Sequence, residues 1–140
     1  MTCVATPGWH QRLVDERPCT KAILIVEDDE AIREGLRLLL EDEGYFVECA
    51  CNGREALAML ERMPPPCVVL LDLMMPVMDG YEFLRVTQAS EPWRTLPITV
   101  VSAAPDTSRI KARRVFRKPV PLGSLLRAVD EDCLRGSDAC

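Results

Sequence analysis

The sequence predicts an α/β protein with a doubly wound, five-stranded parallel sheet. Short apolar runs rich in β-branched residues recur along the chain, as in strands that are buried on both faces. Segments with apolar residues at helical spacing separate these runs from about residue 21 onward. Repeated β–α units of this length form right-handed crossovers, which place helices on both faces of a parallel sheet.

The predicted strands are the five runs that are bounded by turn-forming or charged residues. They span 22–27, 45–50, 67–72, 98–102 and about 114–117. Four helical segments fit between and after them. The first ends at Gly44, a natural C-terminal glycine, the second runs from Asn52-Gly53 to the prolines at 64–66, and the others cover about 80–89 and 122–134.

Helical spacing also predicts which side chains face the core. The expected core residues are Ile32, Leu36, Leu39 and Leu40, then Ala56, Leu57 and Leu60, then Phe83 and Leu84, and finally Leu122, Leu125, Leu126 and Val129. Only residues 106–112 are available for a helix between the fourth and fifth strands, which is two turns at most. That helix should therefore be short or absent.

A chain of 140 residues is long enough for one domain with one hydrophobic core. Residues 1–20 show no periodicity and are expected to form a loose leader. The folded domain should cover 21–134, and residues 135–140 should be frayed. We find no internal repeat and no sign of a second domain.

Composition excludes several classes of function. The net charge of −5 argues against nucleic-acid binding, which needs a clustered basic surface. No apolar run is long enough to span a membrane, and no secretory signal is visible. The seven cysteines have no framework or zinc-site spacing, so free thiols in a reducing cytoplasm are expected, with Cys49, Cys51 and Cys67 as small buried or half-buried residues.

Acidic side chains follow the first and third predicted strands. Glu27 and Asp28 come where the first strand becomes a loop, and Asp72 ends the third. The carboxyl ends of parallel strands form the ligand crevice of an open sheet. Crowded carboxylates raise one another's pKa, and a hard divalent cation relieves that repulsion, so the pattern favours a Mg²⁺ site. A simpler reading is a charged helix start that favours the helix dipole.

Two further groups follow the fourth and fifth strands. Ser102 ends the fourth strand, and Lys118 precedes Pro119 after the fifth. Taken singly, such a serine is usually a turn residue, and such a lysine is usually solvated. Taken with the carboxylates, they form a set that could accept a phosphoryl group in line on Asp72.

Four motifs resemble the receiver domain of two-component response regulators. They are Ile23-Leu24-Ile25-Val26-Glu27-Asp28-Asp29, Leu71-Asp72-Leu73-Met74-Met75-Pro76-Val77-Met78-Asp79-Gly80, Val101-Ser102-Ala103 and Lys118-Pro119. The resemblance covers about residues 21–134, and both the order and the spacing of the motifs agree. It implies a flavodoxin-like fold with strand order 2-1-3-4-5.

The resemblance also implies residue roles. Asp72 would be the phosphoacceptor, and its phosphoryl donor would be a phosphohistidine on a sensor histidine kinase or a phosphotransfer protein. Mg²⁺ would be bound by Asp28 directly, by Glu27 largely through water, by Asp72, and by the backbone carbonyl of Met74. Ser102 would be the switch hydroxyl and Lys118 the phosphate-binding lysine. The chain would then be a stand-alone signalling domain in the cytoplasm that acts by protein contact, not an enzyme.

Two departures from the family concern the output of the signal. Val115 stands where the family usually has an aromatic switch residue, and Lys118 comes only sixteen positions after Ser102, which leaves no room for a full helix. Phosphorylation is therefore expected to change the mobility of residues 103–114 instead of turning a side chain at position 115.

Two other functions are weighed against this one. A receiver-like interaction module that is never phosphorylated would usually lack an acid or the lysine, and none is lost here. A Mg²⁺-dependent phosphohydrolase of the haloacid-dehalogenase type needs a second acid two residues after its aspartate. Position 74 is a methionine, and no cap domain is visible.

Overall fold

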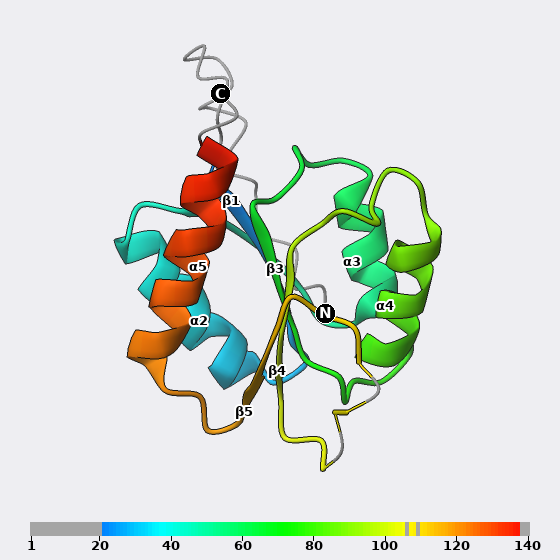
Figure 1. Cartoon of the computed structure of the whole chain (residues 1–140). Coiled ribbons are helices and arrows are strands. Elements are labelled where there is room, and N and C mark those ends of the chain that lie inside the picture. Colours follow the sequence, from blue (N-terminus) through cyan, green and yellow to red (C-terminus); the bar gives the residue numbers. More distant parts are fainter. Residues whose placement is uncertain (1–20, 106, 109, 138–140) are drawn as a thin grey trace.

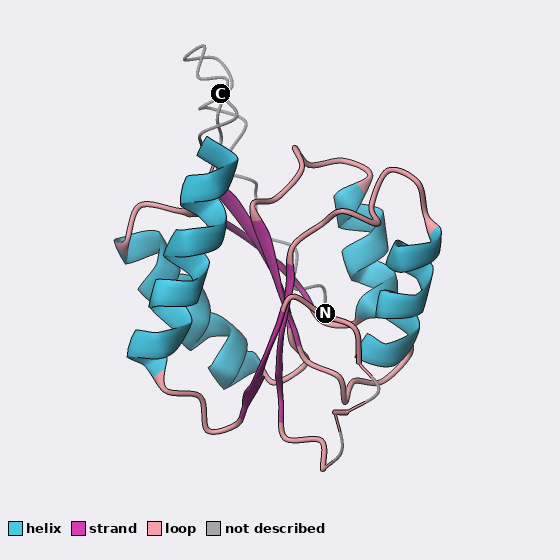
Figure 2. Cartoon of the chain, viewed as in Figure 1, coloured by secondary structure: helices cyan, strands magenta, loops and turns pink. Residues whose placement is uncertain are grey.

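The structure is a five-stranded parallel sheet between two layers of helices (Figures 1 and 2). It is a computed structural model, and it describes residues 21–105, 107–108 and 110–137. The strands are β1 Ala22–Val26, β2 Phe46–Ala50, β3 Val68–Leu71, β4 Ile98–Ser102 and β5 Arg114–Arg117, in the order β2-β1-β3-β4-β5. Both the fold class and the strand order predicted from the sequence are confirmed.

The described helices are α2 Glu30–Asp42, α3 Gly53–Leu60, α4 Gly80–Ala89 and α5 Leu122–Ser137. Three of them begin at a side chain that caps the first turn: Asp29, Asn52 and Asp79 each accept a hydrogen bond from a backbone N–H three residues on. Such caps satisfy donors that have no partner inside the helix. Each of these helices therefore starts at a residue that the sequence itself marks.

The two faces of the sheet carry separate apolar clusters. Helices α2 and α5 cover one face and α3 and α4 cover the other, which Figure 1 shows with the sheet seen along its edge. Alternate strand residues enter the two clusters, as the pleat of a strand requires. In β1, for example, Leu24 packs on the α3 and α4 side, and Ile25 packs on the α2 and α5 side.

No helix lies between β4 and β5 in the described part of that connection, as the short spacing predicts. Ile110 and Ala112 from this segment pack against the cluster on the α3 and α4 side. These two residues do not cover the whole of this face of the sheet, because Val115 in β5 remains 39% exposed. The edge of the sheet at β5 is thus thinly covered on this face.

Three expectations were wrong in detail. Ile32 and Leu122 were expected in the core, but both are exposed, and each lies in the first turn of its helix. Helix α5 continues through Ser137, whereas the sequence predicted an end at 134 with residues 135–140 frayed. Gly136 does not stop the helix. Residues 1–20 and 138–140 lie outside the described part of the chain.

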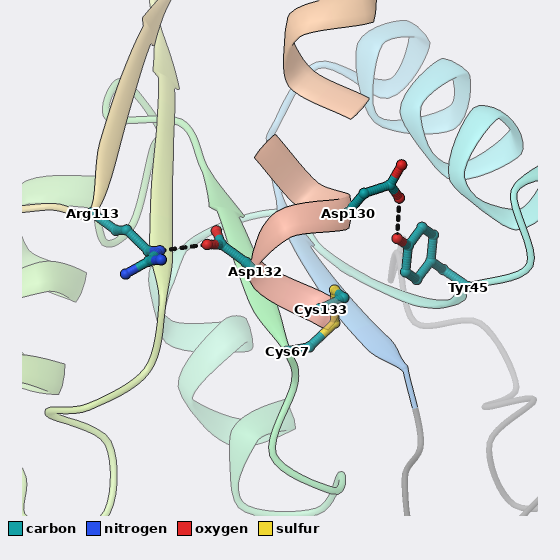
Figure 3. Close-up of a disulfide and its surroundings, with 6 residues drawn as sticks. All are labelled: Tyr45, Cys67, Arg113, Asp130, Asp132 and Cys133. Atoms are coloured by element: carbon teal, nitrogen blue, oxygen red, sulfur yellow. Dashed lines mark hydrogen bonds and ion pairs between the residues drawn. A yellow bond between two sulfur atoms is a disulfide. The ribbon is translucent and has the colours of Figure 1, made fainter. Parts of the chain in front are cut away.

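The prediction of free thiols was also wrong. Cys67, just before β3, forms a disulfide with Cys133 in α5 (Figure 3), and Cys51 is disulfide-bonded too. Among the described cysteines, the buried Cys49 is free. Because 66 positions separate Cys67 from Cys133, nothing in their spacing indicates that the fold brings them together.

The disulfide is one of several links from the same turns of α5 to other segments. Tyr45, before β2, donates a hydrogen bond to Asp130, and Arg113, before β5, forms an ion pair with Asp132 (Figure 3). The Asp132 side chain is buried, and a buried carboxylate requires such a partner. Helix α5 is therefore fastened at the edge of the sheet where β2, β3 and β5 begin.

We predict that replacing both Cys67 and Cys133 by Ala lowers the free energy of unfolding by about 4 kcal/mol, because the disulfide restricts a long loop in the unfolded chain. Chemical denaturation without reductant measures the loss. In the wild type, denaturant and iodoacetamide without reductant should leave both cysteines unlabelled in peptide mass spectra. Full labelling of both, or equal stability of the double variant, would show that the bond does not form.

Candidate functional site

The register of the sheet brings three carboxylates together at one edge. Val26 of β1 pairs with Leu71 of β3, so the residues that follow these strands emerge side by side. The Asp72 N–H donates to the Val26 carbonyl at 2.9 Å, and the Glu27 N–H donates to the Ala50 carbonyl at 3.0 Å. Parallel pairing is thus continued by one residue beyond each strand, which fixes where both acids start.

Carboxylate oxygens of Glu27, Asp28 and Asp72 all lie within 4.8 Å of one another. Glu27 and Asp72 are nearly buried, at 3% and 6% exposed, whereas Asp28 is exposed. Two buried acids beside an exposed third form a partly exposed cluster of negative charge. A cation could reach it from solvent through the Asp28 side.

Lys118 brings a positive charge into this cluster. Its Nζ lies 2.7 Å from Glu27 Oε1 and 3.6 Å from Asp72 Oδ2. The Lys118 N–H donates to the Ser102 carbonyl at 3.1 Å, so β4 holds the backbone from which the lysine reaches across the edge. The Lys118–Pro119 peptide bond is cis.

The pKa values of the paired groups follow from burial and contact. Burial, with a smaller contribution from the nearby Asp72, raises the pKa of Glu27 to about 7 despite the hydrogen bond from Lys118. Partial burial disfavours the charged form of Lys118, but its bond to Glu27 and the attraction of Glu27 and Asp72 prevail and raise its pKa. Lys118 therefore stays charged, and negative charge on Glu27 is costly without further cations.

The structure places Ser102 and Met74 beside this cluster. Ser102 is fully buried at the end of β4, and its Oγ accepts a hydrogen bond from the Ala104 N–H at 3.1 Å. The Met74 N–H is 3.4 Å from Asp72 Oδ1, and the Met74 side chain is largely exposed. Of the residues expected from the sequence, Glu27, Asp28, Asp72 and Lys118 thus form one charged group, and Ser102 and Met74 border it.

Two glycines hold the loop that follows Asp72. A Cβ on Gly80 would collide with the Asp72 carbonyl oxygen and would lie 2.7 Å from Leu73 Cα, so only glycine lets α4 start against the end of β3. The Gly53 N–H donates to the Met78 carbonyl at 2.8 Å. Val77, the residue before Met78, has a φ of 70°, a strained conformation for a β-branched residue.

Arg33 is a buried residue of the site that the sequence reasoning missed. Its Nη1 donates to the carbonyls of Glu27 at 2.9 Å and of Asp28 at 3.4 Å. The guanidinium therefore fixes the backbone of the turn that carries both acids. A signal was present: Arg33 stands three positions before Leu36 and seven before Leu40, on the buried stripe of α2.

A parallel, doubly wound α/β domain with three acids and a lysine at the carboxyl edge of its sheet defines a class of signalling domain, the receiver. The family model "Response regulator receiver domain" matches residues 23–130. The chain belongs to that family. No described helix is long and apolar enough to cross a membrane.

Sequence relatives agree with this assignment. An uncharacterised 14.6 kDa protein from Leptolyngbya boryana, encoded in the sodA1 3' region, is 40% identical over 118 residues, which cover 80% of this chain and 89% of that protein. The response regulator MprA of Mycolicibacterium vanbaalenii is 46% identical over 86 residues, 61% of this chain. That match spans only 36% of MprA.

Solved structures show the same fold. The receiver domain of a signal transduction histidine kinase from Syntrophus aciditrophicus superposes with a TM-score of 0.75 at 31% identity, covering 81% of this chain and 90% of that one. The receiver domain of sensor histidine kinase PA1611 from Pseudomonas aeruginosa PAO1, solved with a magnesium ion in its active site cleft, gives 0.74 at 26% identity and covers 82% of this chain and 98% of that one.

We predict that the Glu27 carboxyl makes the metal-free protein less stable as pH rises. Its pKa is about 7 in the folded chain against an ordinary 4.5, so the neutral form is favoured by folding. That contribution is fully present below pH 4.5 and is lost as pH rises through 7. Relative to Glu27→Gln, the wild type should lose on the order of 3 kcal/mol across this range.

Chemical denaturation in the presence of a chelator, at several pH values, measures this difference. Glu61→Gln is a matched control, because Glu61 is an exposed glutamate outside the cluster. A difference between wild type and Glu27→Gln that stays constant from pH 4.5 to 8 would contradict the raised pKa.

Proposed function

We propose that this domain accepts a phosphoryl group on Asp72 from a phosphohistidine of a sensor histidine kinase or a phosphotransfer protein, with Mg²⁺ as cofactor, and signals by contact with another protein. The observation that carries the proposal is the cluster itself. Asp72 lies at the end of β3, within 4.8 Å of two further carboxylate oxygens and 3.6 Å from a lysine. Acidic residues that lie close together would not by themselves indicate phosphorylation, since charged residues also cluster in structural ion pairs.

The residues present fit a magnesium ion. Hard oxygen ligands suit Mg²⁺, which usually takes one or two carboxylates and keeps several waters. Asp28, Asp72 and the Met74 carbonyl would bind it, and Glu27 would act largely through water. The raised pKa of Glu27 supports this assignment, because a buried carboxylate beside the Asp72 charge is stabilised by added positive charge. When bound, the ion offsets the negative charge of the phosphoryl oxygens.

The chain's own groups have distinct parts in the transfer. An Asp72 carboxylate oxygen attacks phosphorus, the bond between phosphorus and the histidine nitrogen breaks, and that nitrogen keeps the electron pair. Lys118 is already 3.6 Å from Asp72, so a small shift away from Glu27 lets it donate to a phosphoryl oxygen. The Ser102 hydroxyl donates to another, and its oxygen can keep the bond from the Ala104 N–H, because a hydroxyl carries one donor and two acceptor lone pairs.

The output is proposed to pass through the segment between β4 and β5. Ser102 is the residue before this segment. If its hydroxyl moves to bind the phosphoryl group, the backbone of residues 103–105 is expected to move with it. Val115 has no ring to reorient, and a β-branched side chain has few rotamers. We therefore expect phosphorylation to change the order of the segment that Ile110 and Ala112 tie to the core.

A cytoplasmic location fits a protein that meets a kinase's phosphohistidine, and the net charge of −5 does not favour nucleic acid as a partner. In a reducing compartment the Cys67–Cys133 disulfide would be subject to reduction, because thiols there are kept reduced. The transfer chemistry itself does not involve either cysteine.

We predict that incubation with acetyl phosphate and Mg²⁺ adds one phosphoryl group to the intact protein, and that Asp72→Asn abolishes it. Intact mass spectrometry under acidic conditions detects the gain. Asp79→Asn is the matched control: Asp79 caps α4 in the same loop, and Asn caps a helix equally well, so this variant should be labelled like the wild type. Undiminished labelling of Asp72→Asn would refute the assignment of the phosphoacceptor.

A further inference from the structure

A surface groove of about 430 Å³ lies between α4, the loop after it and the end of the segment that leads into β5. Thr87 and Gln88 of α4 line one side, and Lys111 and Arg113 line the groove from the segment before β5. The Gln88 side-chain amide donates to the Lys111 carbonyl, which ties the two walls together.

The floor of the groove is apolar and belongs to the core of this face. Leu96 and Ala112 pack against the cluster beneath α3 and α4, as does Trp93, and all three are only half buried. Ile98, at the start of β4, completes the floor. An indole that rests on the core and still faces solvent can receive an apolar side chain without any rearrangement of the fold.

The rim of the groove is positively charged. Arg94, Lys111 and Arg113 line it, and no acidic residue does. Arg113 is paired with Asp132, and Arg94 has only a distant pair with the exposed Glu91, at 3.5 Å. Such an exposed pair contributes little. Lys111 has no ion pair among the described residues, so a basic rim stands out on a protein whose net charge is −5.

This combination matches what a protein partner needs. Trp and Arg are the residues most enriched among those that dominate binding energy at interfaces, where an apolar anchor is ringed by polar contacts. Complementary charge adds specificity and speeds association. A segment that carries acidic side chains next to an aromatic or branched apolar one would place its ring or alkyl group on Trp93 and its carboxylates against Arg94 and Lys111.

We propose that this groove is the docking site for an acidic, apolar-anchored segment of a partner protein. Its use as the output face rests on the proposed function. One wall is α4, whose first residue packs on the backbone of Asp72. The other wall ends the segment that starts at Ser102. Both walls therefore belong to segments that begin at the edge where Asp72 lies.

The test uses the full chain and a short fluorescein-labelled peptide in which Glu pairs alternate with Leu and Phe. Fluorescence anisotropy at low salt measures its affinity. Arg94→Glu and Lys111→Glu should each weaken binding by about tenfold, since they reverse an exposed rim charge without removing core contacts. Arg127→Glu is the matched control, because Arg127 is exposed on α5, on the opposite face of the sheet.

Three further readouts complete the experiment. The Trp93 indole N–H resonance should shift on binding, with Trp9→Phe used to assign it. A peptide with Lys in place of Glu should not bind. Beryllofluoride with Mg²⁺ should change the affinity of the wild type and not that of Asp72→Asn.

Equal binding of the Lys peptide, equal binding by the groove variants and Arg127→Glu, or an unmoved Trp93 resonance would overturn the docking site. So would self-association of the wild type that Lys111→Glu abolishes, because the occupant would then be a second copy. An affinity that beryllofluoride does not change would overturn its role as output face. Phosphorylation of Asp72, measured separately by mass, distinguishes that result from failure of the proposed function.

Discussion

The charge at the carboxyl edge of β1 and β3 is the constraint on which the site depends. Parallel pairing of Val26 with Leu71 helps bring Glu27, Asp28 and Asp72 into one small volume, where burial and then the nearby Asp72 charge raise the pKa of Glu27. Lys118 offsets part of this charge through its 2.7 Å bond to Glu27. The remainder makes the edge attract a cation. Fold and chemistry are therefore coupled, since the same register that closes the sheet creates the need for positive charge.

The parts around this edge are built to keep the acids where the sheet places them. Arg33 holds the carbonyls of Glu27 and Asp28 from α2, and Gly80 lets α4 begin directly against Asp72 and Leu73. The strained Val77 precedes Met78, whose carbonyl is held by the Gly53 N–H. At the opposite edge, three links fasten α5 to the segments that enter β2, β3 and β5. In the segment between β4 and β5, Ile110 and Ala112 pack on the core and the Gln88 side chain donates to the Lys111 carbonyl. This is the segment that we propose responds to phosphorylation.

The local features of the fold could be read from the sequence, because each has a local cause. Apolar runs marked the strands, Asn52-Gly53 marked the start of the second helix, and the short spacing from Ser102 to Lys118 marked a missing helix. The convergence of Glu27, Asp28, Asp72 and Lys118 followed from one rule, that carboxyl ends of parallel strands share an edge. What could not be read depends on tertiary geometry. No local pattern joins Cys67 to Cys133, or shows that Trp93 and Lys111 border one groove.

Errors in predicting burial have a similar origin. Ile32 and Arg33 are neighbours at the start of α2, yet the isoleucine is exposed and the arginine is buried, because the arginine can use the carbonyls of the preceding turn. Helical spacing identifies the apolar stripe of a helix, but it does not show at which residue along that stripe burial begins. Leu122, the first residue of α5, is exposed. Hydrophobic pattern therefore predicts the middle of each helix better than its first turn.

Magnesium binding to the unphosphorylated protein tests the central claim most directly. The free energy of unfolding is measured at pH 8 with chelator and then with Mg²⁺ at about 100 times its dissociation constant, in the wild type and in Asp28→Ala. If the three carboxylates form the cation site, the wild type gains about 2.7 kcal/mol by mass action, and Asp28→Ala, which removes an exposed ligand and no core contact, gains little. An equal gain in both proteins would show that the cation binds elsewhere and that the acidic edge is not the site.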